Sequence, residues 1–135
     1  MSYSKEELVR HRIERARESL QDAEYLLQEE RWNGAANRMY YACFYVVSAY
    51  MAFKGLTAAT HSGLKSAFNQ ELIKTGRIDR SDGVLFNRLF AIRQRQITKT
   101  LRKSTPEETG GSSLPKINGL ILDIEGVINE ENSPE

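Results

Sequence analysis

Several side chains in this sequence could bind an anionic ligand. Arg38 stands just before a row of three tyrosines, which are Tyr40, Tyr41 and Tyr45. A guanidinium can bind a phosphate group, and a tyrosine ring can stack on a base. His61 and Ser62 stand together at the start of an expected helix, where they could donate hydrogen bonds to an anion. These residue types could therefore form a phosphate-binding site.

Each of these residues also has a structural interpretation. Tyrosines on a central helix usually belong to the core or to a dimer contact. Arg38 could form a structural ion pair instead of binding a ligand. His61 or Ser62 could cap a helix. The residues alone leave both kinds of role open.

Most of these side chains must be positioned by residues 33–54. After Gly34 this stretch contains neither glycine nor proline, so nothing in it should interrupt a helix. Its apolar residues recur at helical spacing and also extend beyond one face. A helix that is apolar on most sides must be covered on most sides. We therefore predict that it is the central helix of a bundle, with Asn33 as its cap and Gly55 as its stop.

Three other amphipathic segments are expected to surround the central helix. Ser4 is the expected N-cap of a first helix that runs to Glu30. A third helix is expected over residues 60–74 with Gly76 closing it, and a fourth over residues 81–103 with Ser81 as its cap. Short turns between such helices are typical of an antiparallel bundle.

The sequence changes character after residue 103. Residues 104–115 contain two prolines and two glycines and are interpreted as a linker. Residues 114–127 are apolar enough for a short fifth helix, which their two glycines weaken. We predict an all-α fold, an antiparallel up-and-down bundle of four main helices plus a weak fifth C-terminal helix. The expected division is a bundle over residues 1–103 and a linker with a short acidic tail over residues 104–135.

Composition indicates a single cytoplasmic domain. The chain has 135 residues, of which 27% are charged and 40% hydrophobic. The longest apolar run is too short to span a bilayer, and the N-terminus lacks the layout of a signal peptide. The single cysteine, Cys43, rules out a disulfide framework or a thiolate metal cage and is interpreted as core filler. We expect no membrane contact, no metal and no cofactor.

Charge is unevenly distributed along the chain. Residues 77–103 contain eight basic and two acidic side chains, whereas residues 107–135 contain seven acidic ones and a single lysine. A basic segment can attract nucleic-acid phosphates. It can equally be a solvated helix face that meets an acidic partner.

Two blocks of sequence carry a family resemblance. They read Ala-Ala-Asn-Arg-Met-Tyr-Tyr-Ala-Cys-Phe-Tyr over residues 35–45 and Thr-His-Ser-Gly over residues 60–63. Together with Phe68, Leu89 and Arg93, these blocks resemble the HEPN domain (higher eukaryotes and prokaryotes nucleotide-binding). The resemblance covers residues 5 to about 95.

The resemblance implies a small helical bundle, often a homodimer, that binds a nucleotide or RNA. Many HEPN proteins are encoded beside a minimal nucleotidyltransferase, with which they form toxin–antitoxin pairs, so such an enzyme is an expected partner. The nucleotide-binding residues that the resemblance and the residue chemistry suggest are Arg38, Tyr41, Tyr45, His61, Ser62 and Arg93.

Many active HEPN proteins are metal-independent RNases that use an Arg followed, after four to six residues, by a His. The arginine holds the phosphate and the imidazole exchanges protons near neutral pH. Here Tyr45 stands where such a His would follow Arg38, and neither His11 nor His61 has an Arg at that distance upstream. Tyrosine is a poor base at neutral pH because its reference pKa is near 10.

We therefore predict a non-catalytic nucleotide-binding or interaction module with no catalytic residues. Two alternatives stay open. One is an RNase toxin with a non-standard site formed by Arg38, Tyr45 and His61. The other is a solitary nucleotide sensor.

The sequence departs from the family pattern after Arg93, where Ala-Asp-Tyr and an acidic-aromatic stretch commonly follow. Synonymous codons for residues 94–104, read two bases later, can encode Glu-Ala-Asp-Tyr-Glu-Asp-Phe-Ala-Glu-Val, which is what the family leads us to expect. We hypothesise that the chain from about Gln94 onward results from a frameshift. In that case, the basic residues after this point were never selected for binding.

Overall fold

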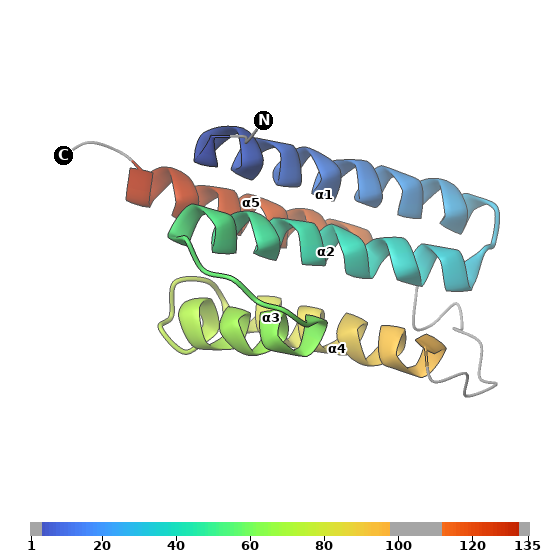
Figure 1. The fold of residues 1–135 in the computed structure, drawn as a ribbon. Helices are drawn as coiled ribbons and strands as arrows, with labels where there is room; N and C mark the ends of the chain where they lie inside the picture. Colours follow the sequence, from blue (N-terminus) through green and yellow to red (C-terminus); the bar gives the residue numbers. More distant parts are fainter. Residues whose placement is uncertain (1–3, 98–111, 133–135) are drawn as a thin grey trace.

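The computed structural model describes residues 4–97 and 112–132 and shows an all-α bundle (Figure 1). Within these residues a π-helical turn, η1 (Asn69–Ile73), directly follows the third helix. The helices are α1 (Lys5–Gln28), α2 (Trp32–Lys54), α3 (His61–Phe68), α4 (Arg80–Ile97) and α5 (Ser113–Asn132). The predicted all-α bundle with a fifth C-terminal helix is confirmed.

Helix α2 is the centre of the bundle, as predicted. It packs against each of the other four helices. Its buried residues lie on most of its circumference, and Met39, Tyr40, Cys43 and Val46 have no exposed surface. The broad apolar surface that the sequence shows is therefore covered on several sides. Gly55 ends the helix in a left-handed conformation with φ of 72°, also as predicted.

Two of the predicted helix caps are wrong. The chain reverses at Glu30, which has a positive φ of 56°, so α2 already begins at Trp32 and Asn33 lies inside the helix. Helix α4 begins before Ser81, whose backbone N–H donates to Asp79 Oδ1 at 3.1 Å. In both places the helix begins before the residue that the sequence predicts as its cap. The cap predicted at the first helix is confirmed, because Ser4 Oγ accepts a hydrogen bond from the Glu7 N–H at 3.2 Å.

The connection between α2 and α3 determines where His61 lies. Residues 55–60 run back along α2, and Thr60 caps α3 by accepting a hydrogen bond from the Gly63 N–H at 2.9 Å. His61 consequently lies beside Tyr40, in the middle of α2, rather than near the end of α2. From there α3 and η1 run in the same direction as α2, and α4 returns (Figure 1).

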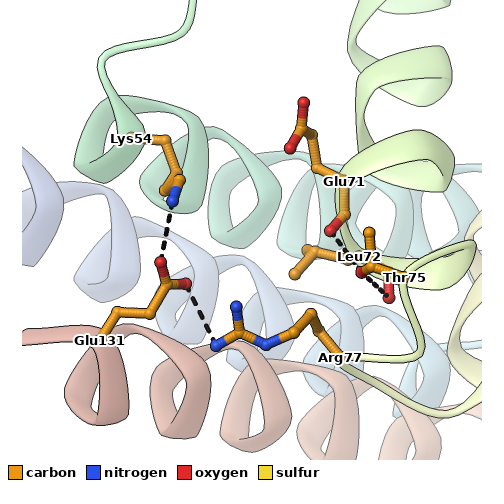
Figure 2. Close-up of polar contacts among 6 residues, drawn as sticks. All are labelled: Lys54, Glu71, Leu72, Thr75, Arg77 and Glu131. Atoms are coloured by element: carbon orange, nitrogen blue, oxygen red, sulfur yellow. Dashed lines mark hydrogen bonds and ion pairs between the residues drawn. The ribbon is translucent and has the colours of Figure 1, made fainter.

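The predicted third helix loses its regular geometry at η1. After this π-helical turn, Thr75 Oγ1 donates a hydrogen bond to the Glu71 carbonyl at 2.7 Å (Figure 2). Gly76 then takes a left-handed conformation with φ of 73°, where the sequence predicts the stop.

Helix α5 is longer and more deeply buried than its sequence suggests. It packs against α1, α2 and α4. Its apolar residues Ile117, Leu120, Ile121 and Ile124 have no exposed surface. Two glycines in a helix interior cost about 1 kcal/mol each, which is less than the burial of several large side chains contributes.

A carboxylate near the end of α5 ties this helix to two other parts of the bundle. Glu131 Oε1 accepts a hydrogen bond from Lys54 Nζ at 2.8 Å, and Glu131 Oε2 lies 3.3 Å from Arg77 Nη2 (Figure 2). Lys54 is the last residue of α2, and Arg77 follows η1. We call these three residues the Glu131 ion-pair group.

Part of the predicted organisation lies outside the described residues. The expected continuation of the fourth helix over residues 98–103 and most of the linker over residues 104–111 belong to that part. The domain division at residue 103 and the frameshift from about Gln94 stay predictions. Among the residues that the structure describes, no helix is both long enough and apolar enough to cross a membrane.

Candidate functional site

Four of the six predicted site residues come together where α2, α3 and α4 meet. Arg38 and Tyr41 belong to α2, His61 is the first residue of α3, and Arg93 belongs to α4. Arg93 Nη2 lies 3.4 Å from Tyr41 Oη and 3.5 Å from His61 Nε2. The Arg38 and Arg93 guanidinium carbons lie 5.0 and 5.7 Å from the centroid of the Tyr41 ring. We call these four residues the arginine cluster.

Aromatic rings hold the His61 imidazole in place. Tyr40 is fully buried, and its Oη lies 2.8 Å from His61 Nδ1. The Phe44 ring stacks on the imidazole with 4.7 Å between the centroids. The Arg93 guanidinium lies 5.2 Å from the centroid of the Tyr40 ring. Tyr40 is thus a supporting residue of the site, although the sequence gives it only as an alternative to Tyr41 for stacking.

The electrostatic environment favours a neutral His61. Burial lowers the pKa of His61, and the positive charge of Arg93 lowers this pKa further. Because an arginine can only donate hydrogen bonds, the Nε2 atom beside Arg93 is best assigned as the unprotonated nitrogen. Nδ1 then carries the proton, and its N–H donates a hydrogen bond to Tyr40 Oη. Tyr40 stays a neutral phenol, since burial raises its pKa to about 12.

Among the described residues, no carboxylate neutralises the positive charge of the arginine cluster. Within the described residues, neither Arg38 nor Arg93 forms an ion pair, so the structural ion pair considered for Arg38 is not observed there. Arg38 Nη2 donates instead to the neutral amide oxygen of Asn37 at 2.9 Å. A guanidinium has five N–H donors and binds phosphate in bidentate geometry. The cluster could therefore bind a phosphate group.

The two other predicted site residues are placed differently: Ser62 lies apart from this cluster, whereas the Tyr45 ring borders it, with its centroid 5.9 Å from that of Tyr41. Ser62 is exposed on α3, and Thr60 rather than His61 or Ser62 supplies the cap. Tyr45 Oη accepts a hydrogen bond from Arg15 Nη2 at 3.2 Å, and the Arg15 guanidinium lies 5.2 Å from the centroid of the Tyr45 ring. Tyr45 therefore faces α1.

A cavity of about 590 Å³ lies between α1, α2 and residues 55–60, and we call it the α1–α2 cavity. His11, Arg12 and Arg15 line it from α1, and His61 lines it from α3. No sequence pattern singles out Arg12 or Arg15 of the first helix as site residues, so the cavity could not be predicted from them. The sequence does contain one signal that could have indicated this wall of the cavity. In a helical hairpin that turns at Glu30, residues equally distant from the turn lie opposite each other. Arg15 pairs with Tyr45 in this way.

The structure also brings an arginine and a histidine together in space without the spacing that RNase members of the family use. Arg93 and His61 come from different helices, yet their side-chain nitrogens lie 3.5 Å apart. The arrangement can hold a phosphate. A proton transfer by His61 would require Nε2 to exchange Arg93 for a substrate hydroxyl.

The described part of the chain contains no evident set of metal ligands. No group of three or more His, Cys, Asp or Glu side chains within it could hold a metal ion. Cys43 has no exposed surface, and burial raises the pKa of its thiol, as expected of a core residue.

The chain is similar in sequence to several known proteins. The chain is 47% identical over 90 residues to a UPF0332 protein of Thermotoga maritima, covering 67% of this chain and 68% of the relative. It is 39% identical over 67 residues to a protein of Methanocaldococcus jannaschii named "Putative toxin MJ0142", covering 50% and 46%. It is 38% identical over 66 residues to the UPF0332 protein glr0978 of Gloeobacter violaceus, covering 49% and 52%.

The chain thus spans about two thirds of the first of these relatives and about half of the other two. The family model of the HEPN domain matches residues 9–108, which include every residue of the arginine cluster and of the wall that α1 gives to the α1–α2 cavity. With this match over most of its length, the chain belongs to the HEPN domain family.

Proposed function

We propose that this HEPN domain is a non-catalytic module that binds a nucleotide or a segment of RNA through the phosphate group. One observation carries the proposal: two half-buried guanidiniums, those of Arg38 and Arg93, contact Tyr41, and neither has a carboxylate partner among the described residues. A phosphate between them would supply the missing negative charge, and the Tyr41 ring could stack on a base.

The surroundings of His61 support binding rather than cleavage. Both ring nitrogens already have protein neighbours, Tyr40 Oη at 2.8 Å and Arg93 Nη2 at 3.5 Å. A general base must lie within hydrogen-bond reach of the substrate proton. In this arrangement His61 orients Arg93, and the arginine holds the phosphate.

The test is the affinity for a short single-stranded RNA, measured by fluorescence anisotropy at low and physiological salt. Replacing Arg93 by alanine should weaken binding by about 10-fold or more, because a hydrogen bond to a charged group contributes about 1.5–3 kcal/mol. The matched control is Arg80→Ala, which removes an exposed arginine from the start of the same helix. Equal losses in both variants, or no binding by the unmodified protein, would refute a specific site.

In this proposal the domain works in the cytoplasm as the partner of a minimal nucleotidyltransferase in a toxin–antitoxin pair. The name "Putative toxin MJ0142" of one relative supports this context. Co-expression with a nucleotidyltransferase encoded beside the gene should yield a complex that survives affinity and size-exclusion chromatography. Light scattering on the isolated protein should give the mass of a homodimer; a monomer would contradict that part of the proposal.

A second candidate function, an RNase toxin, is favoured by the contact between Arg93 and His61. In such an enzyme Arg93 would hold the phosphate, and a released His61 Nε2 would accept the proton of the attacking 2′-hydroxyl. Incubation with single-stranded RNA distinguishes the two functions. Binding without cleavage supports the non-catalytic module, whereas cleavage that disappears in His61→Gln and in Arg93→Ala, but not in Arg80→Ala, would establish the enzyme.

A further inference from the structure

We propose that a cavity between α4 and α5 binds an aliphatic diamine, which is a carbon chain with an ammonium group at each end. The cavity has a volume of about 470 Å³, and we call it the α4–α5 cavity. Asp79, Asp82 and Asp123 line it, and none of its described lining residues belongs to the arginine cluster or to the α1–α2 cavity. The inference therefore does not depend on the proposed binding of RNA.

The carboxylate of Asp82 lacks the hydrogen-bond donors that a buried carboxylate needs. Asp82 is only 7% exposed, and it lines the cavity. Its Oδ2 atom is buried and has no hydrogen-bond partner among the described residues. A buried acceptor without a partner costs free energy. A ligand with an ammonium group would supply both N–H donors and a compensating charge.

Two further carboxylates add negative charge to this cavity. Asp123 lines it from α5, and Asp79 lines it from the residue just before α4. Asp82 itself lies in the first turn of α4, where the helix dipole favours a negative charge. In the part of the chain that the structure describes, no ion pair joins any of these three carboxylates to a basic side chain. A cation in the cavity would therefore meet negative charge that has not been neutralised.

Two basic side chains also line the cavity, but they do not compensate the charge of Asp82. Arg88 Nη2 donates to Ser113 Oγ at 2.8 Å, and Lys116 is exposed on α5. Burial, and then the carboxylate of Asp123, raise the pKa of Asp82 to about 7. Burial and like charge thus outweigh the two bases at this carboxylate. A bound cation would act in the opposite direction and would favour ionised Asp82.

The shape and lining of the cavity favour two separated charges on an apolar chain over a metal ion. No group of three carboxylates within the described residues could hold a metal ion, so the three aspartates do not converge on one point. The volume lies within the range of roughly 300–1,000 Å³ found for small-molecule sites. Val84 and Leu85 also line the cavity, and methylene groups could pack against them. One ammonium group would lie between Asp82 and Asp123, and the other would reach Asp79.

The test compares putrescine, n-butylamine and Mg²⁺ as ligands of the full chain in isothermal titration calorimetry at pH 8. Putrescine should bind about 10-fold or more tightly than the other two, because only putrescine has two charges on one carbon chain. Asp82→Asn and Asp123→Asn should each weaken this binding by about 10-fold or more, since each removes a carboxylate that holds an ammonium group. Asp22→Asn replaces an exposed aspartate on α1 that does not line the cavity, and this matched control should keep full affinity.

A variant that fills the cavity separates binding from folding defects. Gly119 lines the cavity, and a Cβ atom at this position meets no atom within 4 Å, so Gly119→Leu fits the fold. Leucine also favours a helix more than glycine does. This variant keeps all three carboxylates, and it should lose putrescine binding without a fall in melting temperature.

The pH dependence of binding gives an independent measurement. The bound ammonium group requires ionised Asp82, whose pKa in the free protein is about 7, whereas an alkylammonium keeps its proton well above pH 8. The affinity for putrescine should therefore rise from pH 5 to pH 8, with release of a proton on binding near pH 7. An affinity that does not change with pH would overturn the proposal. So would the absence of putrescine binding, equal affinity for n-butylamine or Mg²⁺, or full affinity in Asp82→Asn or Gly119→Leu.

Discussion

Basic side chains gather in the Glu131 ion-pair group and in the arginine cluster, and among the described residues only the first of these two groups has a carboxylate in contact. In the Glu131 ion-pair group, Lys54 and Arg77 share Glu131 (Figure 2). In the arginine cluster, Arg38 and Arg93 contact tyrosine rings and neutral acceptors, with no ion pair among the described residues. We expect the first arrangement to stabilise the fold and the second to leave positive charge for a ligand.

The comparison shows why counts of basic residues along a sequence are a poor guide to function. Arg77 and Arg93 both lie in the basic stretch over residues 77–103. Arg77 pairs with a carboxylate from α5, more than 50 positions away, whereas Arg93 has no such partner in the part of the chain that the structure describes. The difference depends on tertiary contacts, which charge patterning along the chain does not reveal.

The largest effect should come from placing a carboxylate in the arginine cluster. Arg93→Glu would give Arg38 an acidic neighbour and repel phosphate, so RNA affinity should fall by about 100-fold, or roughly 2.7 kcal/mol. Urea unfolding should show little change in stability, because Arg93 has no ion pair with any described residue. A marked loss of stability with unchanged RNA affinity would mean that Arg93 has a structural role. The arginine cluster would then not differ in function from the Glu131 ion-pair group.

The Glu131 ion-pair group should respond in the opposite way. Glu131→Gln should lower the melting temperature by roughly 2–4 °C and leave RNA affinity unchanged. The hydrogen bond from Lys54 lowers the pKa of Glu131 below its ordinary value of 4.5. The stabilisation is therefore present above pH 4.5 and is lost as the pH falls through the folded-state pKa. Thermal melts of the two proteins should converge in acid; a constant difference would contradict this assignment.

A smaller effect with the reverse pH dependence is expected at Asp82, a buried carboxylate on α4. Burial, and then the carboxylate of Asp123 on α5, raise the pKa of Asp82 from 3.8 to about 7. Between these values the folded state holds a proton that the unfolded state has lost, so stability should fall as the pH rises from about 4 to 7.

Asp82→Asn should remove this dependence and stabilise the protein above pH 7 by on the order of 1 kcal/mol. Urea unfolding at pH 5 and pH 8 measures the effect, and Glu131→Gln is the control with the opposite slope. An Asp82→Asn variant that is less stable at pH 8 would show that the carboxylate has a favourable partner.

The central helix could be predicted from sequence because its signal is local. The unbroken apolar stretch and the glycine at residue 55 specify α2 without reference to other helices. Helix α5 was underestimated because its two glycines lower helix propensity, while the burial of residues such as Ile121 depends on tertiary packing. The resemblance to HEPN domains gave the family and four residues that do meet, Arg38, Tyr41, His61 and Arg93.

The geometry of the site could not be predicted, because it depends on the direction of one connection. Residue patterns give no sign that residues 55–60 run back along α2 and bring His61 to Tyr40 and Arg93. For the same reason the α1–α2 cavity was missed: its walls come from α1, α2 and this connection. Arg15 contacts Tyr45, which is 30 positions away in the sequence.

Residues 55–60 run back along α2, so the length of this exposed segment determines how far back along α2 His61 can lie. His61 stacks on Phe44, ten positions before the end of α2 at Lys54, and ten helical residues span about 15 Å. Removing three residues would leave four Cα–Cα steps, which reach about 14 Å at most. The imidazole would then be pulled away from Arg93 although no residue of the arginine cluster had been replaced. Shortening this exposed connection between α2 and α3 would therefore separate the arginine and the histidine of the cluster without any substitution in it.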